Sequence, residues 1–273
     1  MIILNAVVIL SVITIAYKAE EKDTFLRRQI RYWYGVPLIM LTFKELYVMI
    51  KPMRGVDYDH YLILIDRWIF GFDPTVELLK IASPLLTEFL QIIYATFYFL
   101  PMILAGNLLK KDKKLEADYT IFSIIFGFFV SYIGYMLVPA IGPRFHLHDF
   151  EMTNTELPGL FLTNFLREII NMGESIPAGT PNPAEVVQRD VFPSGHTMMT
   201  AITMYLAVRF KSPSKWLLLP VGTLLIFSTV YLRYHYAIDV IAGLLCMALS
   251  LWLGRYYYNY YARKTGRKEI SNV

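Results

Sequence analysis

Long apolar runs constrain the fold of this chain more than any other feature. A helix of about 20 apolar residues spans the roughly 30 Å hydrocarbon core of a bilayer. Hydrophobic residues make up 56% of the 273 residues and charged residues only 18%, against about 25% charged residues in soluble domains. Seven runs are long enough to span, or nearly so: 1–17, 32–50, 86–108, 119–141, 194–209, 215–232 and 235–258. We therefore predict an all-α, polytopic membrane bundle of about seven transmembrane helices.

The first run, 1–17, is short enough to be a secretory signal. It lacks a basic start and a clear small-x-small cleavage site, so we predict an uncleaved N-terminal span beside a six-helix core. Two further stretches, 61–70 and 162–170, have apolar residues at helical spacing but are too short and too polar to cross a bilayer. We predict that they form amphipathic helices in the membrane interface.

The segment 172–192 follows the second of these stretches. It carries Pro177, Gly179, Pro181 and Pro183 within seven residues and has neither a helical nor a strand pattern. Two interpretations stay open for this coil, a mobile flap over a site and a plain surface loop.

Two short segments at the ends of apolar runs place histidines where membrane helices should begin. Polar groups in such places are costly and usually functional. In the first segment, Phe192-Pro193-Ser194-Gly195-His196, Ser194 is a good N-cap, and the free N–H groups of the first turn make an anion site. Gly195 would let the backbone approach a phosphate, and His196 would lie beside it, suited to donate a proton.

The second segment, 231–239, places His235 and Asp239 four residues apart, on one face of a helix. Asp239 can accept a hydrogen bond from one imidazole nitrogen and leave the other free to attack phosphorus, which is the orienting logic of a catalytic triad. Arg233 in the adjoining turn and Arg144 after the fourth run are candidates to bind the phosphate.

A metal site is the alternative to consider near residue 146. His146, His148 and Asp149 are close in sequence, but no further ligands follow at a set spacing. We interpret these residues as a solvated loop and predict no metal and no cofactor.

The two histidine segments resemble the type 2 phosphatidic acid phosphatase superfamily, over roughly residues 32–258. Pro193-Ser194-Gly195-His196 matches its second motif, and Ser228, His235 and Asp239 match its third. The resemblance implies a helical, metal-independent enzyme that forms a phosphohistidine. His235 would then be the nucleophile, His196 the acid for the leaving group and Asp239 the partner of His235, while Ser194 and Gly195 would bind phosphate.

The chain departs from the family pattern at two expected cations. Thr229 stands where the third motif has arginine, and Leu137 stands where the first motif has lysine. In addition, a proline precedes Arg144 instead of following it. Arg233 and Lys44, which lies inside a span, are candidate substitutes. With these departures, the Tyr-Leu-x-x-His-Tyr-x-x-Asp spacing and the segment 66–74 look closer to the inositol phosphorylceramide synthase-like, or inositolphosphotransferase, branch, whose members move phosphorylated head groups between lipids.

The positions of lysine and arginine predict the orientation, because cytoplasmic loops are enriched in them. Most of the 26 basic residues lie on one side of the alternating spans, in 18–31, 109–118, 209–215 and 255–268. We expect this side and the C-terminus to be cytoplasmic. Both histidine segments then face the outer side, whether periplasmic, extracellular or lumenal.

Together these features predict a three-part chain: an N-terminal span with its linker at 1–31, a six-helix catalytic domain at 32–258 and a basic tail at 259–273.

The function predicted is cleavage or transfer of a phosphate or phosphorylated head group on a lipid, in the manner of a phospholipid head-group phosphotransferase. A simple lipid phosphate phosphatase is the alternative, and a seven-span transporter or receptor without turnover is the hypothesis from another class. The expected partners are a lipid phosphate or phospholipid, an acceptor lipid alcohol and the membrane, and no nucleic acid.

Overall fold

A computed structural model describes residues 2–21, 24–53 and 55–271, and the described residues contain helices and no strand. The all-α class predicted from the apolar runs is therefore confirmed. The chain divides into two compact units, Met1–Met49 and Ile50–Val273.

The first unit consists of α1 (Ile2–Glu21), α2 (Phe25–Trp33) and most of α3 (Gly35–Met53). The side chain of Thr24 caps α2 by accepting a hydrogen bond from the backbone N–H of Arg27. α2 and α3 together are apolar enough to cross a membrane over Phe25–Ile50.

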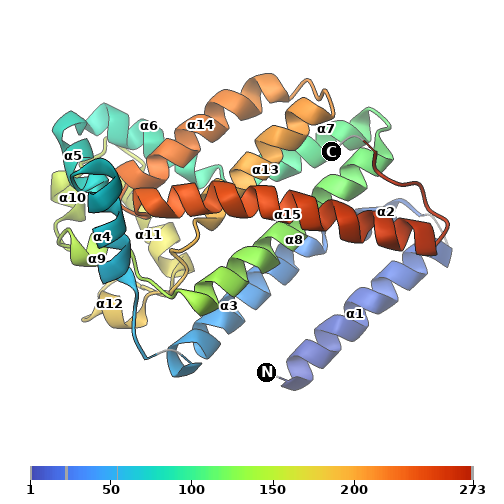
Figure 1. The fold of residues 1–273 in the computed structure, drawn as a ribbon, viewed down its shortest axis with the longest axis horizontal. Helices are drawn as coiled ribbons and strands as arrows, with labels where there is room; N and C mark the ends of the chain where they lie inside the picture. Colours follow the sequence, from blue (N-terminus) through green and yellow to red (C-terminus); the bar gives the residue numbers. More distant parts are fainter. Residues whose placement is uncertain (1, 22–23, 54, 272–273) are drawn as a thin grey trace. The chain divides into compact units, whose positions relative to one another are not determined.

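The second unit is a bundle of six main helices: α6 (Pro84–Ala95), α7 (Phe99–Lys110), α8 (Lys114–Leu137), α13 (Gly195–Arg209), α14 (Lys215–Tyr231) and α15 (Ala237–Lys264). α13 is the central helix and packs against α7, α8, α14 and α15 (Figure 1). It buries residues on all sides, which explains why its small and apolar residues follow no single stripe. The bundle instead turns large apolar side chains outward, such as Leu245 and Trp252 of α15, as expected of a surface that faces lipid.

The number of membrane spans predicted, seven, is not confirmed. Within the described part of the chain, three helical segments are long and apolar enough to cross, or up to four if the pair α6 and α7, bent by 52°, counts as one span. α13 has 15 residues and α14 has 17, and at 1.5 Å per residue such helices are shorter than the roughly 30 Å hydrocarbon core. The count of seven stays a prediction.

Shorter helices gather at the end of the bundle where α15 begins (Figure 1). They are α4 (Asp59–Phe70), α5 (Pro74–Glu77), the 3-10 helix η1 (Leu78–Ile81), α9 (Pro143–His146), α10 (Thr153–Glu156), α11 (Thr163–Gly173) and α12 (Pro183–Val186).

The two amphipathic helices expected from the sequence are present as α4 and α11. In α11 the polar residues Thr163 and Arg167 are buried, whereas the apolar Phe165 and Ile169 are exposed. In α4, the exposed Trp68 faces outward, and two aspartates lie on the buried face. α4 also buries Leu62 and Ile63. Both helices nevertheless expose large apolar side chains, as expected at a membrane interface.

Candidate active site

Two histidines distant in sequence meet at the starts of α13 and α15. His196 is the second residue of α13, and His235 lies in the turn between α14 and α15. The Nε2 atom of His235 is 3.5 Å from the Nδ1 atom of His196. The structure thus brings together the two residues that the sequence predicts as nucleophile and acid.

The second ring nitrogen of His235 faces two oxygen atoms. Nδ1 lies 3.0 Å from the backbone oxygen of Val191 and 3.5 Å from Oδ2 of Asp239. A carbonyl oxygen can only accept a hydrogen bond, so this contact assigns the proton to Nδ1 and leaves the lone pair on Nε2. His235 is only 4% exposed, so few other groups compete for its nitrogens.

The sequence predicts that Asp239 orients His235. In the structure both Asp239 and the Val191 carbonyl face Nδ1 of His235. Its Oδ2 accepts a 2.7 Å hydrogen bond from the backbone N–H of Tyr236, which caps α15. The nearer acceptor for His235 is the Val191 carbonyl. A backbone carbonyl leaves no signal in the sequence, which is why sequence reasoning missed it.

The start of α13 has the cap that the sequence suggests. The side-chain oxygen of Ser194 accepts a hydrogen bond from the N–H of Thr197 at 3.2 Å. The N–H of Ser194 in turn donates to the backbone oxygen of Asp239 at 3.0 Å. This bond ties the two histidine segments directly together.

Gly195 has a packing reason as well as a chemical one. A Cβ atom at this position would lie 2.3 Å from the Tyr135 hydroxyl oxygen, well inside van der Waals contact. The glycine therefore lets α8 approach the start of α13.

An aromatic stack lies against His196. The Tyr94 ring stacks on His196 with ring centroids 4.7 Å apart and on Tyr234 with centroids 4.5 Å apart. Phe97 lies on His196 with centroids 4.3 Å apart. Sequence reasoning missed Tyr94 and Phe97 because they belong to an ordinary apolar run, 86–108.

The two arginines predicted to bind phosphate have different surroundings. Arg144 ion-pairs with Glu174, donates to Asn171 at 3.0 Å and lies over the ring of Tyr234, 5.2 Å from its centroid. Arg233 is fully buried and pairs with Glu156 of α10 at 2.5 Å. Lys44, the weaker substitute, lies on α3 in the first unit, whereas the histidine pair belongs to the second.

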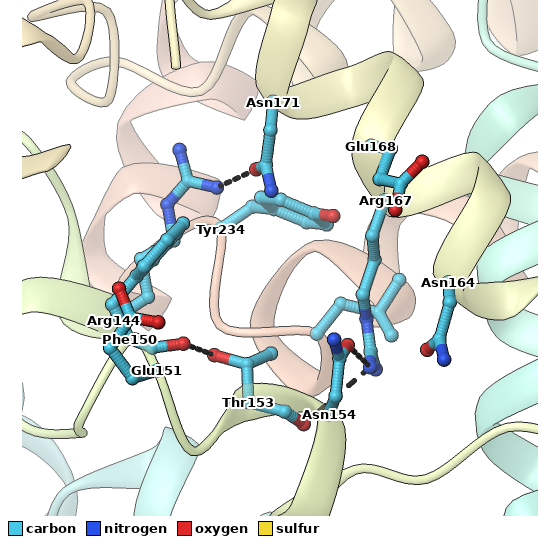
Figure 2. Close-up of a pocket in the computed structure, with 11 residues that line it drawn as sticks. Arg144, Phe150, Glu151, Thr153, Asn154, Asn164, Arg167, Glu168, Asn171 and Tyr234 are labelled. Carbon is cyan, nitrogen blue, oxygen red and sulfur yellow. Dashed lines mark hydrogen bonds between the residues drawn. The ribbon is translucent and has the colours of Figure 1, made fainter. Parts of the chain in front are cut away.

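A polar pocket of about 110 Å³ opens beside Tyr234. Arg144 and Arg167 lie on opposite sides of it (Figure 2). Arg167 donates to the Asn154 side chain at 2.8 Å and to the backbone oxygen of Leu157 at 2.7 Å. The other side chains of the wall are mostly polar: Glu151, Thr153, Asn164, Glu168 and Asn171, with Phe150 and Leu232. The pocket offers many donors and acceptors to a polar group.

His146 and His148, the alternative metal candidates, have separate protein partners. Nε2 of His146 lies 3.6 Å from the Asp59 carboxylate, and this contact raises the pKa of His146. Nε2 of His148 lies 3.0 Å from the Thr75 hydroxyl. Burial, together with the positive charge of Arg233, lowers the pKa of His148 to about 4.

The structure thus brings the two histidine segments side by side, at the starts of two helices of an all-α bundle. The chain belongs to the PAP2 superfamily, whose sequence profile matches residues 60–253. This match confirms the resemblance of the two histidine segments at the level of the superfamily.

A curated relative agrees with this assignment. The chain is 27% identical over 190 residues to a PA-phosphatase related-family protein of Dictyostelium discoideum, a match that covers 63% of this chain and 32% of the relative. The chain thus matches about a third of the length of that relative. No solved structure matches the chain.

Proposed function

We propose that the protein is an integral membrane enzyme that cleaves or transfers the phosphorylated head group of a lipid, without a metal, through a phosphohistidine. The observation that carries this proposal is the orientation of His235. Its Nδ1 faces Val191 and Asp239, and its Nε2 faces His196 at 3.5 Å. A nucleophile with one nitrogen held and the other unprotonated, next to a candidate acid, supplies two of the groups that phosphoester cleavage needs.

In the first half of the reaction, Nε2 of His235 attacks phosphorus and the bond from phosphorus to the leaving oxygen breaks. His196 donates its proton to that oxygen. The positive charge that develops on the His235 ring is stabilised by the Asp239 carboxylate and the Val191 carbonyl, which hold the Nδ1 proton. In the second half, water or an alcohol attacks phosphorus, His196 takes up the proton of the attacking oxygen and the bond to His235 breaks.

The phosphate would be held at the start of α13 by Ser194 and Gly195, with Arg144 supplying positive charge. Arg144 is the better placed of the two arginines because it lies over Tyr234, the residue before His235. Arg233 would take part by exchanging its Glu156 partner for a phosphate oxygen.

Whether water or an alcohol completes the reaction separates a phosphatase from a transferase. The polar pocket favours transfer, because it offers a place for a polar head group or acceptor beside Arg144 and Tyr234, the residue before His235. The resemblance to the inositol phosphorylceramide synthase-like branch favours the same outcome. Hydrolysis of a lipid phosphate such as phosphatidic acid is the second candidate, since the same phosphohistidine serves both.

The test is an acceptor-dependence assay on purified protein with a panel of phospholipids, with and without lipid alcohols and chelator. Head-group exchange that requires an alcohol identifies a transferase, and phosphate release without one identifies a phosphatase. H235A is expected to abolish both, and H60A, which alters an exposed histidine of α4, is the matched control. Chelator-sensitive turnover contradicts the metal-free mechanism. Full activity of H235A contradicts the role of the histidine.

A further inference from the structure

α4 carries two aspartates on the face that it turns to the protein. Asp59 is 1% exposed and Asp66 is 2% exposed. They are seven residues apart, so they lie two turns, or about 10 Å, from each other along one side of the helix. A buried carboxylate is costly unless hydrogen bonds satisfy it, so the partners of these two residues indicate what they do.

Asp59 holds the loop that leads to Arg144. Its two oxygens accept hydrogen bonds from the backbone N–H groups of Ile141 at 3.0 Å and Gly142 at 2.7 Å. Gly142 has a φ of +99°, a conformation that glycine tolerates best. The same carboxylate accepts a 2.9 Å hydrogen bond from the Tyr236 hydroxyl.

Asp66 holds the start of α15. It accepts hydrogen bonds from the backbone N–H groups of Ala237 at 2.9 Å and Ile238 at 2.7 Å. The N–H groups of a helix's first turn have no partner inside the helix, and the negative charge is favourable there. The N–H of Tyr236 is taken by Asp239. Three consecutive N–H groups that follow His235 are therefore bound by carboxylates.

The surroundings of the two carboxylates shift their pKa values in opposite directions. Burial alone would raise the pKa of Asp59, but His146 and the N–H groups of Ile141 and Gly142 outweigh it and lower that pKa. For Asp66 burial dominates, and its pKa is raised although the two N–H groups oppose the change. Among the described residues, the partners of the two carboxylates are these backbone N–H groups, the Tyr236 hydroxyl and His146, so their effect on His235 is indirect.

We propose that Asp59 and Asp66 are positioning residues, by which α4 fixes the Arg144 loop and the His235 turn in one geometry. The inference rests on the proposed function, because it assigns a task in the reaction of His235. A misplacement of about 1 Å in reacting groups can lower a rate by about a hundredfold, so a rigid connection between the two segments matters to catalysis.

The test compares D59N and D66N with D73N, all purified in the full-length chain. Asn keeps the size of the side chain but replaces one acceptor oxygen with an N–H₂ group, which cannot accept from a backbone N–H. Asp73 is the matched control because it pairs with Arg67 at the surface and not with either segment. D59N and D66N are expected to lower kcat about ten- to a hundredfold with KM within about twofold, whereas D73N leaves both unchanged.

Two further readouts separate positioning from folding. In D66N, amide hydrogen exchange is expected to rise in the peptide around 236–240 while the core helix α13 stays protected. Y236F removes only the hydroxyl that Asp59 binds and is expected to lower kcat less than D59N; it replaces D59N if that variant fails to fold.

The proposal is overturned if kcat per folded protein in D59N and D66N equals that of D73N. If the wild type shows no turnover with any substrate, the proposed function fails, and exchange still decides whether Asp66 holds the turn. Unchanged exchange around 236–240 in D66N then contradicts the positioning role independently of activity.

Discussion

The direction of His235 decides its chemistry at the scale of single residues. A ring nitrogen that faces a carbonyl carries the proton, so the other nitrogen has the lone pair and is nucleophilic. In this chain the carbonyl of Val191 and the carboxylate of Asp239 share the Nδ1 side of His235. In the reaction that we propose, the carbonyl sets the tautomer and the carboxylate supplies the negative charge that stabilises an imidazolium.

Asp239→Asn tests whether the Val191 carbonyl and the Asp239 carboxylate have these separate roles. The variant removes the charge but leaves the Val191 carbonyl, so the tautomer is kept while the developing charge loses its partner. We expect turnover to fall by a factor on the order of 10² to 10⁴, with the helix content by circular dichroism preserved. Turnover within about twofold of the wild type would show that the Val191 carbonyl alone is enough to orient and stabilise His235.

His146 gives the protein a pH-dependent contribution to stability. Its pKa in the folded state is raised by the contact with Asp59, so the folded state binds the proton more tightly than the unfolded state. The stabilisation is present below pH 6.5, the ordinary value, and is lost as the pH rises through the higher folded-state pKa. Because the side chain is 39% exposed, we expect less than about 1 kcal/mol.

The measurement is the melting temperature of wild type and H146Q across pH 5 to 9. At low pH the wild type is expected to have the higher melting temperature, and the difference between the two melting temperatures should shrink above pH 6.5. A difference that grows with pH contradicts the assignment.

At the scale of elements, the start of α13 depends on the close approach of α8. G195A would place a methyl group against the Tyr135 hydroxyl. We expect a loss of about 1–3 kcal/mol of stability from this overpacking. Y135F removes the oxygen, and the next nearest atom of the ring, Cζ, lies at 3.6 Å, so G195A/Y135F is expected to recover the stability.

Activity of the same double variant separates the two roles of Gly195. If the glycine also lets the backbone approach phosphate, G195A/Y135F regains its melting temperature but not its kcat, while Y135F alone stays active. If G195A/Y135F regains both its melting temperature and its kcat, Gly195 is needed only for packing.

The elements that sequence could predict are those with a local signal. The apolar runs predict the main helices, and Pro193-Ser194-Gly195-His196 predicts the capped start of α13, because N-capping is a local interaction. Tyr94, Phe97 and Arg167 were missed, because their importance arises from contacts between distant segments. Asp66 lies in the stretch 61–70 predicted as an interfacial helix and Asp59 precedes it, and only the folded bundle brings the two carboxylates to Ala237 and Gly142.

At the scale of the whole molecule, the distribution of lysine and arginine predicts the orientation in the membrane. The histidine pair would open to the outer side, and the basic tail 259–273 would lie in the cytoplasm. The single cysteine, Cys246, makes this testable once it is replaced by serine.

In that background, A178C in the loop before α12 and K268C in the tail introduce single thiols at exposed positions. An impermeant maleimide added to intact cells or sealed vesicles with the outer face exposed is expected to label A178C, and K268C only after permeabilisation. The reverse pattern would place the site on the cytoplasmic side.

Covalent capture of phosphorus by His235 is the central step of the proposed reaction. The direct measurement is rapid quenching of wild type, H196A and H235A with a phospholipid labelled at its head-group phosphate, followed by mapping of the label on the protein. We expect a label that is stable to base and labile to acid at His235 in the wild type, and none in H235A. In H196A the acid is missing, so labelling should be slow. Label retained in H235A, or a wild type that turns over with no label on the protein at any time, would contradict the nucleophilic role of His235.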